Sequence, residues 1–126
     1  MSIQNYSDSV TYKADSAINQ YGFVKQSSGA YVTQLTSGAT RGAWIALNAT
    51  TGVDILIECA VEAGAQALLK VDGAYSVGQE LMAGSSGFGT AATANNIISA
   101  IQREASTASG DIVVVEIAGQ GGYKST

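Results

Sequence analysis

The chain has 126 residues, of which 46% are apolar and only 13% charged, and its formal net charge is −4. This length corresponds to a single domain that can bury a core without help from metals or disulfides. The many apolar residues and few charges exclude a disordered chain, which shows the opposite balance. Histidine, the commonest general base and metal ligand, is absent, so we expect no enzyme, no cofactor and no metal site.

The six basic residues are scattered along the chain. Nucleic-acid binding draws its affinity from grouped Lys and Arg, so we expect no nucleic-acid partner. No apolar run approaches the roughly 20 residues of a membrane span, and the opening MSIQNYSDSV lacks the basic and apolar segments of a signal peptide. We therefore expect no membrane partner. Cys59 is the single cysteine, and we interpret it as a small buried apolar residue.

Residues 1–20 are mostly polar, and they carry Tyr6 and Tyr12. Val10 and Tyr12 alternate with polar residues, which indicates a short strand. We interpret the segment as an extended N-terminal arm with a strand-like middle, and a frayed terminus is the alternative. Tyrosine offers a large, rigid contact area with a polar tip, which favours an arm that docks on a partner.

From residue 21 onward, short β-type runs alternate with turn-forming residues. The expected strands, in chain order, are residues 22–25, 31–35, 42–49, 53–61, 68–71, 77–82, 97–103 and 111–117. No window of about 12 residues keeps the helical period of 3.6. Many short strands with glycine turns predict an all-β domain over residues 21–118, a small β-sandwich or β-barrel with little helix. The glycine-rich residues 119–126 are expected to form a flexible tail.

Residues 53–61 form the clearest expected strand, because their apolar and polar positions alternate with period two. The odd-numbered, apolar positions are expected to face the core. Asp54, Glu58 and Glu62 share the other face, where a carbohydrate-binding protein would hold a cation. A row of this kind is more often the solvated face of a sheet. Residues 111–117 are apolar on both faces, which predicts a strand that is covered on both sides.

The glycine-rich run GSSGFG at residues 84–89 resembles a phosphate-binding loop only in composition. It lacks the Gly-Lys-Ser/Thr signature, and no helix of useful length follows it, so we favour a structural loop. Catalytic triads built on serine or cysteine need the missing histidine. Trp44 is expected in the core, and an interface anchor is the alternative.

A succession of short motifs marks residues 42–117. The motifs are GAWIALNA at 42–49, AGA at 63–65, Asp72-Gly73, Gly78-Gln79 and ASGDIVVV at 108–115. This succession resembles the small capsid decoration (cement) proteins of tailed bacteriophages. Asn5-Tyr6 also fits the opening of that family, whereas its Gly-Asp-Pro-Val turn has no counterpart because this chain contains no proline.

The resemblance implies a virion protein that binds the exterior of an assembled phage head as a homo-oligomer, commonly a homotrimer, and stabilises the capsid. Its implied partners are the major capsid protein of the same virus and further copies of itself, after synthesis in the host bacterial cytoplasm. Linked copies dissociate slowly from the capsid, because each bound copy holds the others at high effective concentration near their own binding sites.

Together with the tyrosines of the arm, the resemblance predicts capsid contacts at Ile3, Tyr6, Tyr12 and Lys13. Two alternative functions remain. One is a different virion component, such as a tail, fibre or head-spike subunit. The other is a carbohydrate-binding β-sandwich.

Overall fold

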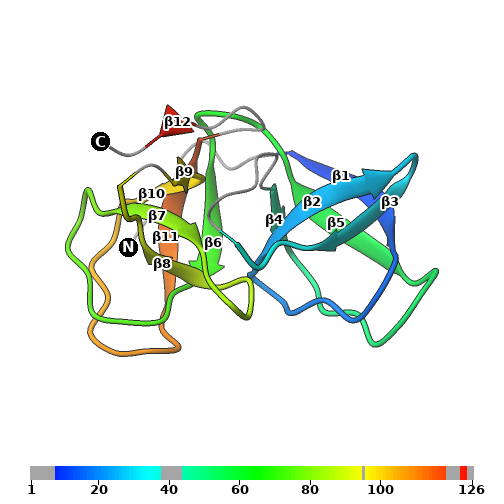
Figure 1. The fold of residues 1–126 in the computed structure, drawn as a ribbon, viewed down its shortest axis with the longest axis horizontal. Helices are drawn as coiled ribbons and strands as arrows, with labels where there is room; N and C mark the ends of the chain where they lie inside the picture. Colours follow the sequence, from blue (N-terminus) through cyan, green and yellow to red (C-terminus); the bar gives the residue numbers. More distant parts are fainter. Residues whose placement is uncertain (1–7, 38–43, 95, 119–122, 125–126) are drawn as a thin grey trace.

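The computed structural model describes residues 8–37, 44–94, 96–118 and 123–124. These residues form twelve strands and no helix, so the predicted all-β class is confirmed. In these ranges, accordingly, no helix could cross a membrane. The strands gather in two lobes that lie side by side (Figure 1).

The first lobe is a closed five-stranded barrel. Its strands are β1 (Ser9–Ala14), β2 (Phe23–Ser28), β3 (Tyr31–Gln34), β4 (Trp44–Ala46) and β5 (Leu56–Ala60), in the order β1-β3-β2-β4-β5. The pairing of β1 with β3 is parallel, and the other pairings are antiparallel. Residues 9–14 of the predicted arm thus form a strand that is paired on both edges and closes the barrel.

The second lobe is a five-stranded antiparallel sheet with a small ladder beside it. Its strands are β6 (Gln66–Lys70), β7 (Glu80–Ala83), β8 (Gly89–Ala91), β10 (Ala100–Gln102) and β11 (Ile112–Ile117), in the order β6-β11-β10-β7-β8. A parallel bridge between Val71 and Gly89 connects the two outer strands of this order. The ladder pairs β9 (Ile97–Ile98) with β12 (Tyr123–Lys124).

Several expected strands are found where the sequence predicts them. β2 and β3 form the expected hairpin, whose turn contains Gly29 in the left-handed region at φ 55°. In β11, residues 113–115 are buried on both faces of the strand, as its two-sided apolar pattern predicts. The run at 97–103 is divided into β9 and β10 by Ser99, whose N–H donates to the carbonyl of Leu81.

The prediction for residues 53–61 is wrong at its beginning. β5 starts only at Leu56, and Asp54 occupies a turn with a left-handed φ of 66°. Val53 and Ile55 therefore lie exposed instead of facing the core. Ile57 and Cys59 do face the core, since the period-two pattern begins with the strand itself.

The barrel has its own apolar interior. The buried residues that fill it are Ala14, Ile18, Val24, Val32, Trp44, Ala46, Ile57 and Cys59. Trp44 is 7% exposed, so its expected place in the core is confirmed. The ring of Tyr12 stacks on Trp44 with centroids 5.1 Å apart and planes 18° apart, a favourable offset arrangement.

A second core joins the two lobes. Its barrel members are Phe23, Leu35, Ile45 and Ala60, and they pack with buried aliphatic residues of β6, β7, β10 and β11. β2 and β4 therefore present apolar side chains on both faces. Neighbouring side chains of a strand point in opposite directions, so Phe23 and Ile45 reach the shared core while Val24 enters the barrel.

Hydrogen bonds across the seam fix how the lobes meet. The N–H of Phe23 donates to the carbonyl of Gly87 at 2.7 Å, and the N–H of Lys70 donates to the carbonyl of Tyr21 at 2.9 Å. The side-chain amide of Asn19 donates to the carbonyl of Ser86 at 3.0 Å. The GSSGFG run is thus a structural loop that packs its backbone against the barrel, as expected.

Gly87 provides a test of this seam. Alanine there would be strained at φ +80°, and its Cβ would lie 2.9 Å from Cγ of Gln34 and 3.3 Å from the carbonyl oxygen of Leu35. Gly64 is a matched control, because its φ is +81° and no atom lies within 4 Å of the added Cβ. We expect Gly64→Ala to cost about 1–2 kcal/mol of unfolding free energy from strain alone.

Gly87→Ala is expected to cost about 1–3 kcal/mol more than the control, because the added methyl group overpacks the seam. Urea unfolding of the two variants measures the difference. Equal losses of unfolding free energy in the two variants would show that the contact between the Gly87 loop and β3 is too loose to hold the lobes together.

Cys59 provides a test of the barrel interior. Burial, together with the negative charge of the neighbouring Glu58, raises the pKa of its thiol from 9.0 to about 12. A rise of three units lowers the reactive thiolate fraction about a thousandfold at neutral pH. We expect a thiol reagent to label the folded protein at least about a thousandfold more slowly than the denatured protein. Native labelling at the rate of a free thiol would contradict a closed barrel.

Candidate functional site

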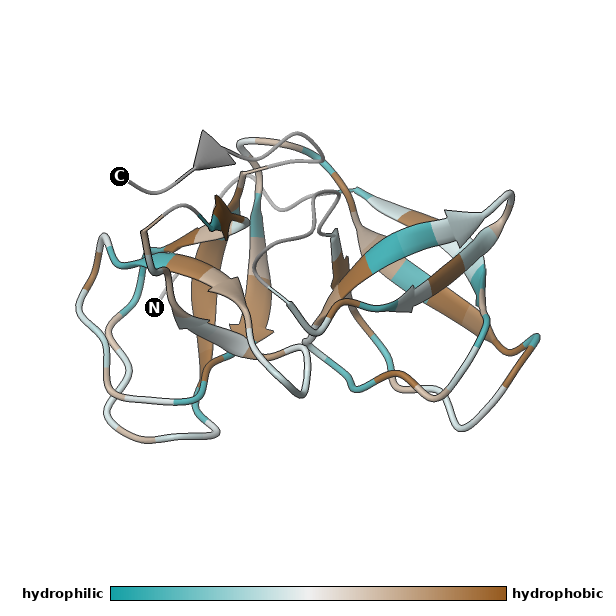
Figure 2. Cartoon of the chain, viewed as in Figure 1, coloured by the Kyte–Doolittle hydropathy of each residue, from teal (hydrophilic) through white to brown (hydrophobic). Residues whose placement is uncertain are grey.

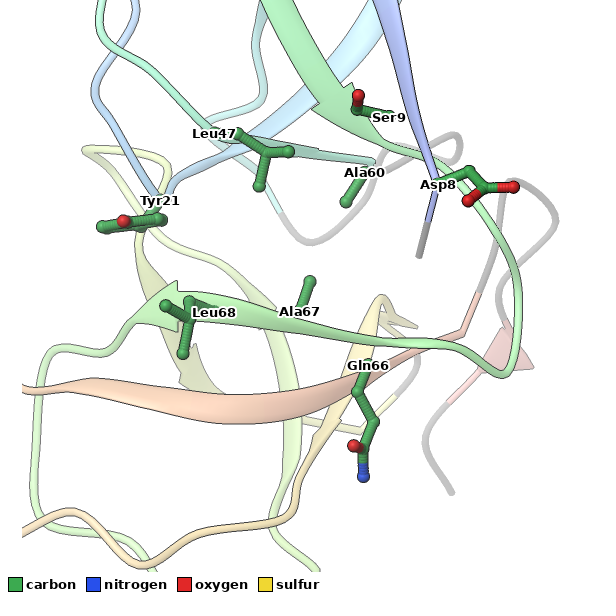
Figure 3. Close-up of a pocket in the computed structure, with 8 residues that line it drawn as sticks. All are labelled: Asp8, Ser9, Tyr21, Leu47, Ala60, Gln66, Ala67 and Leu68. Atoms are coloured by element: carbon green, nitrogen blue, oxygen red, sulfur yellow. The ribbon is translucent and has the colours of Figure 1, made fainter. Parts of the chain in front are cut away.

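A groove lies between the two lobes of the described structure. Its volume is about 440 Å³, and its lining residues are Asp8, Ser9, Tyr21, Leu47, Ala60, Gln66, Ala67 and Leu68 (Figure 3). β6 and the barrel form its opposite walls. The lining is apolar in the middle and polar at the end where Asp8 lies.

Small side chains keep this groove open. Ala60 at the end of β5 and Ala67 on β6 lie on opposite walls (Figure 3). Both also border the shared core, so the groove is the unfilled outer margin of that core. The hydrogen bond from Lys70 to the carbonyl of Tyr21 holds the two walls together near one end.

The opposite end of the groove is acidic. The N–H of Asp8 donates to a carboxylate oxygen of Glu62 at 2.5 Å, which places two acidic residues close together. The whole chain is also negative, with ten acidic and six basic residues.

The three acids that are predicted to share one strand face do not converge. Asp54 accepts a hydrogen bond from the hydroxyl of Tyr31, and Glu58 accepts one from the hydroxyl of Thr11. Glu62 bonds instead at the acidic end of the groove. Among the described residues, no three His, Cys, Asp or Glu side chains are grouped to hold a metal ion. A cation site on these acids therefore has no geometric support.

Apolar residues lie at the outer end of the barrel, where the chain enters β5 (Figure 2). We call Val53, Ile55 and Leu56 the barrel tip; their side chains are 61%, 38% and 63% exposed. Two backbone hydrogen bonds to Ala14 hold this segment. The N–H of Asp54 donates to the carbonyl of Ala14, and the N–H of Ala14 donates to the carbonyl of Ile55. The sequence analysis missed this surface, although Gly52 and Asp54 are both turn-forming residues that signal a late strand start.

The four predicted contact residues are placed differently. Ile3 and Tyr6 lie outside the described residues. Tyr12 is half-buried and stacked inside the barrel. Lys13 is exposed on β1 and is the cross-strand partner of Leu56, so the structure brings it next to the barrel tip. A capsid-contact role for these residues stays a prediction.

Comparison with known proteins gives a likeness of fold. No family model matches the chain, and no curated protein is similar to it in sequence. Among solved structures, the chain is similar to the N base of the head fiber gp8.5 of bacteriophage phi29. The TM-score is 0.70 at 15% sequence identity, and the match covers 94% of this chain and 98% of that chain. The two chains therefore share both lobes and their arrangement.

Proposed function

We propose that this chain is a structural protein of a bacteriophage virion that binds the outside of the head and has no catalytic activity. The observation that carries the proposal is the likeness of fold to a head fiber base over nearly the whole of both chains. The motif succession at residues 42–117, which resembles capsid decoration proteins, supports the same location. The proposed partners are the major capsid protein and further copies of this chain.

The barrel tip and Lys13 form the proposed docking surface. Exposed apolar side chains that are gathered in one place mark interaction sites, and a neighbouring cation adds orientation. A specific interface buries about 800 Å² per partner, far more than three side chains supply. Docking through this tip therefore needs several linked copies, each of which raises the effective concentration of the others. A homotrimer on a repetitive head surface meets this requirement.

A second candidate function is the base of a head fibre. The similar solved structure is named as such a base, and it matches this chain along its length. In the cement function, the bound protein bridges capsid subunits and opposes their separation. In the base function, it also carries a further protein outward. Both functions need the same docking on the head.

Co-sedimentation with undecorated heads of the virus that encodes the chain tests the proposal. We expect saturable pelleting, at a ratio of protein to capsid subunit that corresponds to a set of symmetry axes. Heads should then resist heating or chelation better than undecorated heads if the protein acts as a cement. Saturable binding without added head stability would favour the base function, and no binding to either expanded or unexpanded heads would overturn both.

The predicted contact residues can be tested in the same assay. Deleting residues 1–7 removes Ile3 and Tyr6 but leaves β1 intact, since β1 begins at Ser9. Lys13→Glu reverses the charge beside the barrel tip, and Lys25→Glu on β2 makes the same charge change elsewhere on the barrel. We expect the deletion and Lys13→Glu to weaken pelleting about tenfold, the size of a loss near 1.4 kcal/mol.

Lys25→Glu should bind heads as the unchanged protein does. The deletion and both charge reversals should keep the melting temperature of the unchanged protein. Equal weakening by both charge reversals would indicate a general electrostatic effect, in contradiction to a contact at Lys13. Unchanged binding after the deletion would remove Ile3 and Tyr6 from the docking surface.

A further inference from the structure

The two lobes are built on one plan. In the first lobe, the strands follow one another around the barrel as β1-β3-β2-β4-β5, and β1 is parallel to β3. In the second lobe, β6, β8, β7, β10 and β11 take these places in turn, and the bridge from Val71 to Gly89 makes the end of β6 parallel to β8. Every strand pairing of the first lobe therefore has a counterpart of the same direction in the second.

The register of the pairings repeats as well. Val24 pairs with Gln34 in the first lobe, and Leu81 pairs with Ala91, 57 residues further along the chain, in the second. The same shift relates Lys13 to Lys70, whose partners across the ladder to β5 and β11 are Leu56 and Ile112. From β4 onward the shift is 56 residues, as Leu56 and Ile112 show.

The loops repeat their hydrogen bonds with the same shifts. The hydroxyl of Thr50 accepts from the N–H of Ile18, and the hydroxyl of Ser106 accepts from the N–H of Tyr75. The strained Tyr21 has its counterpart in Gly78, which holds a left-handed φ of 93°. The second lobe is thus a copy of the fold of the first, and the two lobes can be compared residue by residue.

One group of outward-facing side chains keeps its chemistry in both copies. We call Lys13, Tyr31 and Leu56 the first-lobe triad; Lys13 is the register partner of the other two. Their chain neighbours Ala14, Val32 and Ile57 are in the core of the barrel, so alternation turns the triad outward.

The counterparts Lys70, Phe88 and Ile112 form the second-lobe triad. Lys70 is the register partner of Ile112, and its Nζ lies 5.0 Å from the centroid of the Phe88 ring. Lys70 and Phe88 are half-buried and Ile112 is exposed, as Leu56 is in the first lobe. Each triad thus combines a lysine, an aromatic ring and an exposed aliphatic side chain on three neighbouring strands.

Core packing does not account for this match, because neither triad belongs to a core. Other outward positions differ between the lobes. Lys25 corresponds to Met82, and the exposed Thr11 corresponds to Leu68. The shared fold therefore leaves outward side chains free to vary, and the match of the two triads needs another reason.

We propose that the second-lobe triad is a second docking site, which binds the same surface of the major capsid subunit as the first-lobe triad. One chain then bridges two neighbouring subunits. This inference rests on the proposed function and extends its docking surface to the second lobe. A repetitive head presents one subunit surface many times, so two equivalent sites on one chain fit two copies of one partner. The lysine of each triad favours a carboxylate beside apolar side chains on that partner.

Co-sedimentation with heads tests the two sites by matched changes. Leu56→Ser and Ile112→Ser remove equivalent aliphatic side chains, which are 63% and 45% exposed. Val77→Ser is the control, because Val77 is 60% exposed in the second lobe but lies outside the triad. We expect each triad variant to weaken pelleting about tenfold, and the double variant about a hundredfold. Val77→Ser should pellet as the unmodified protein does.

Cross-linking of the unmodified protein on heads identifies the partner surface without any variant. A carbodiimide joins a lysine amine to a nearby carboxylate as an amide, with loss of water. We expect Lys13 and Lys70 to be linked to the same Asp or Glu of the capsid subunit, and mass spectrometry of the digested complex identifies the pair. If Ile112→Ser unfolds, this measurement decides the question.

Unchanged pelleting of Ile112→Ser, with weakened pelleting of Leu56→Ser, would overturn the proposal and confine docking to the first lobe. A cross-link from Lys13 with none from Lys70, or links to different capsid residues, would also overturn it. Equal pelleting of both serine variants and the unmodified protein would move docking away from both triads, while head binding itself would stand. If the unmodified protein does not pellet, the proposed function fails.

Discussion

Burial of Phe23 between the two lobes is the contact on which the rest of the structure depends. Phe23 is 1% exposed, and it packs in the shared core while its backbone bonds to Gly87 in the other lobe. Its neighbour Val24 fills the barrel. The wall formed by β2 and β4 thus belongs to both cores. A change in that wall would disturb both lobes at once, so the molecule behaves as one unit rather than two tethered lobes.

Tyr21 shows how tightly this junction is determined. It holds a left-handed φ of 59°, a conformation that costs a non-glycine residue about 1–2 kcal/mol. Two backbone bonds keep it there: its N–H donates to Ala46 at 2.7 Å, and its carbonyl accepts from Lys70 at 2.9 Å. The same residue lines one end of the groove. The groove therefore lies beside a point of the seam where the backbone is strained and held by two hydrogen bonds.

The surfaces of this protein are suited to adhesion. The groove offers an apolar middle, and the barrel tip offers exposed aliphatic side chains beside Lys13. The buried thiol of Cys59, whose pKa is raised, packs in the apolar interior of the barrel.

Local features of the sequence determined the all-β class, the β2–β3 hairpin, the buried middle of β11 and the core position of Trp44. These follow from alternation and turn chemistry, which act over a few residues. The same reasoning failed at Val53 and Ile55, because the turn at Asp54 delays the strand.

Only the tertiary structure decided between barrel and sandwich, and it alone revealed the groove. Both depend on pairings between distant segments, such as Val10 with Cys59 and Leu68 with Val114. Which backbone groups of β6 face the groove is a matter of register against β11. The hydrophobic pattern of a strand indicates which of its faces is buried, but which strand lies along each of its edges is decided only when the distant segments of the sheet come together.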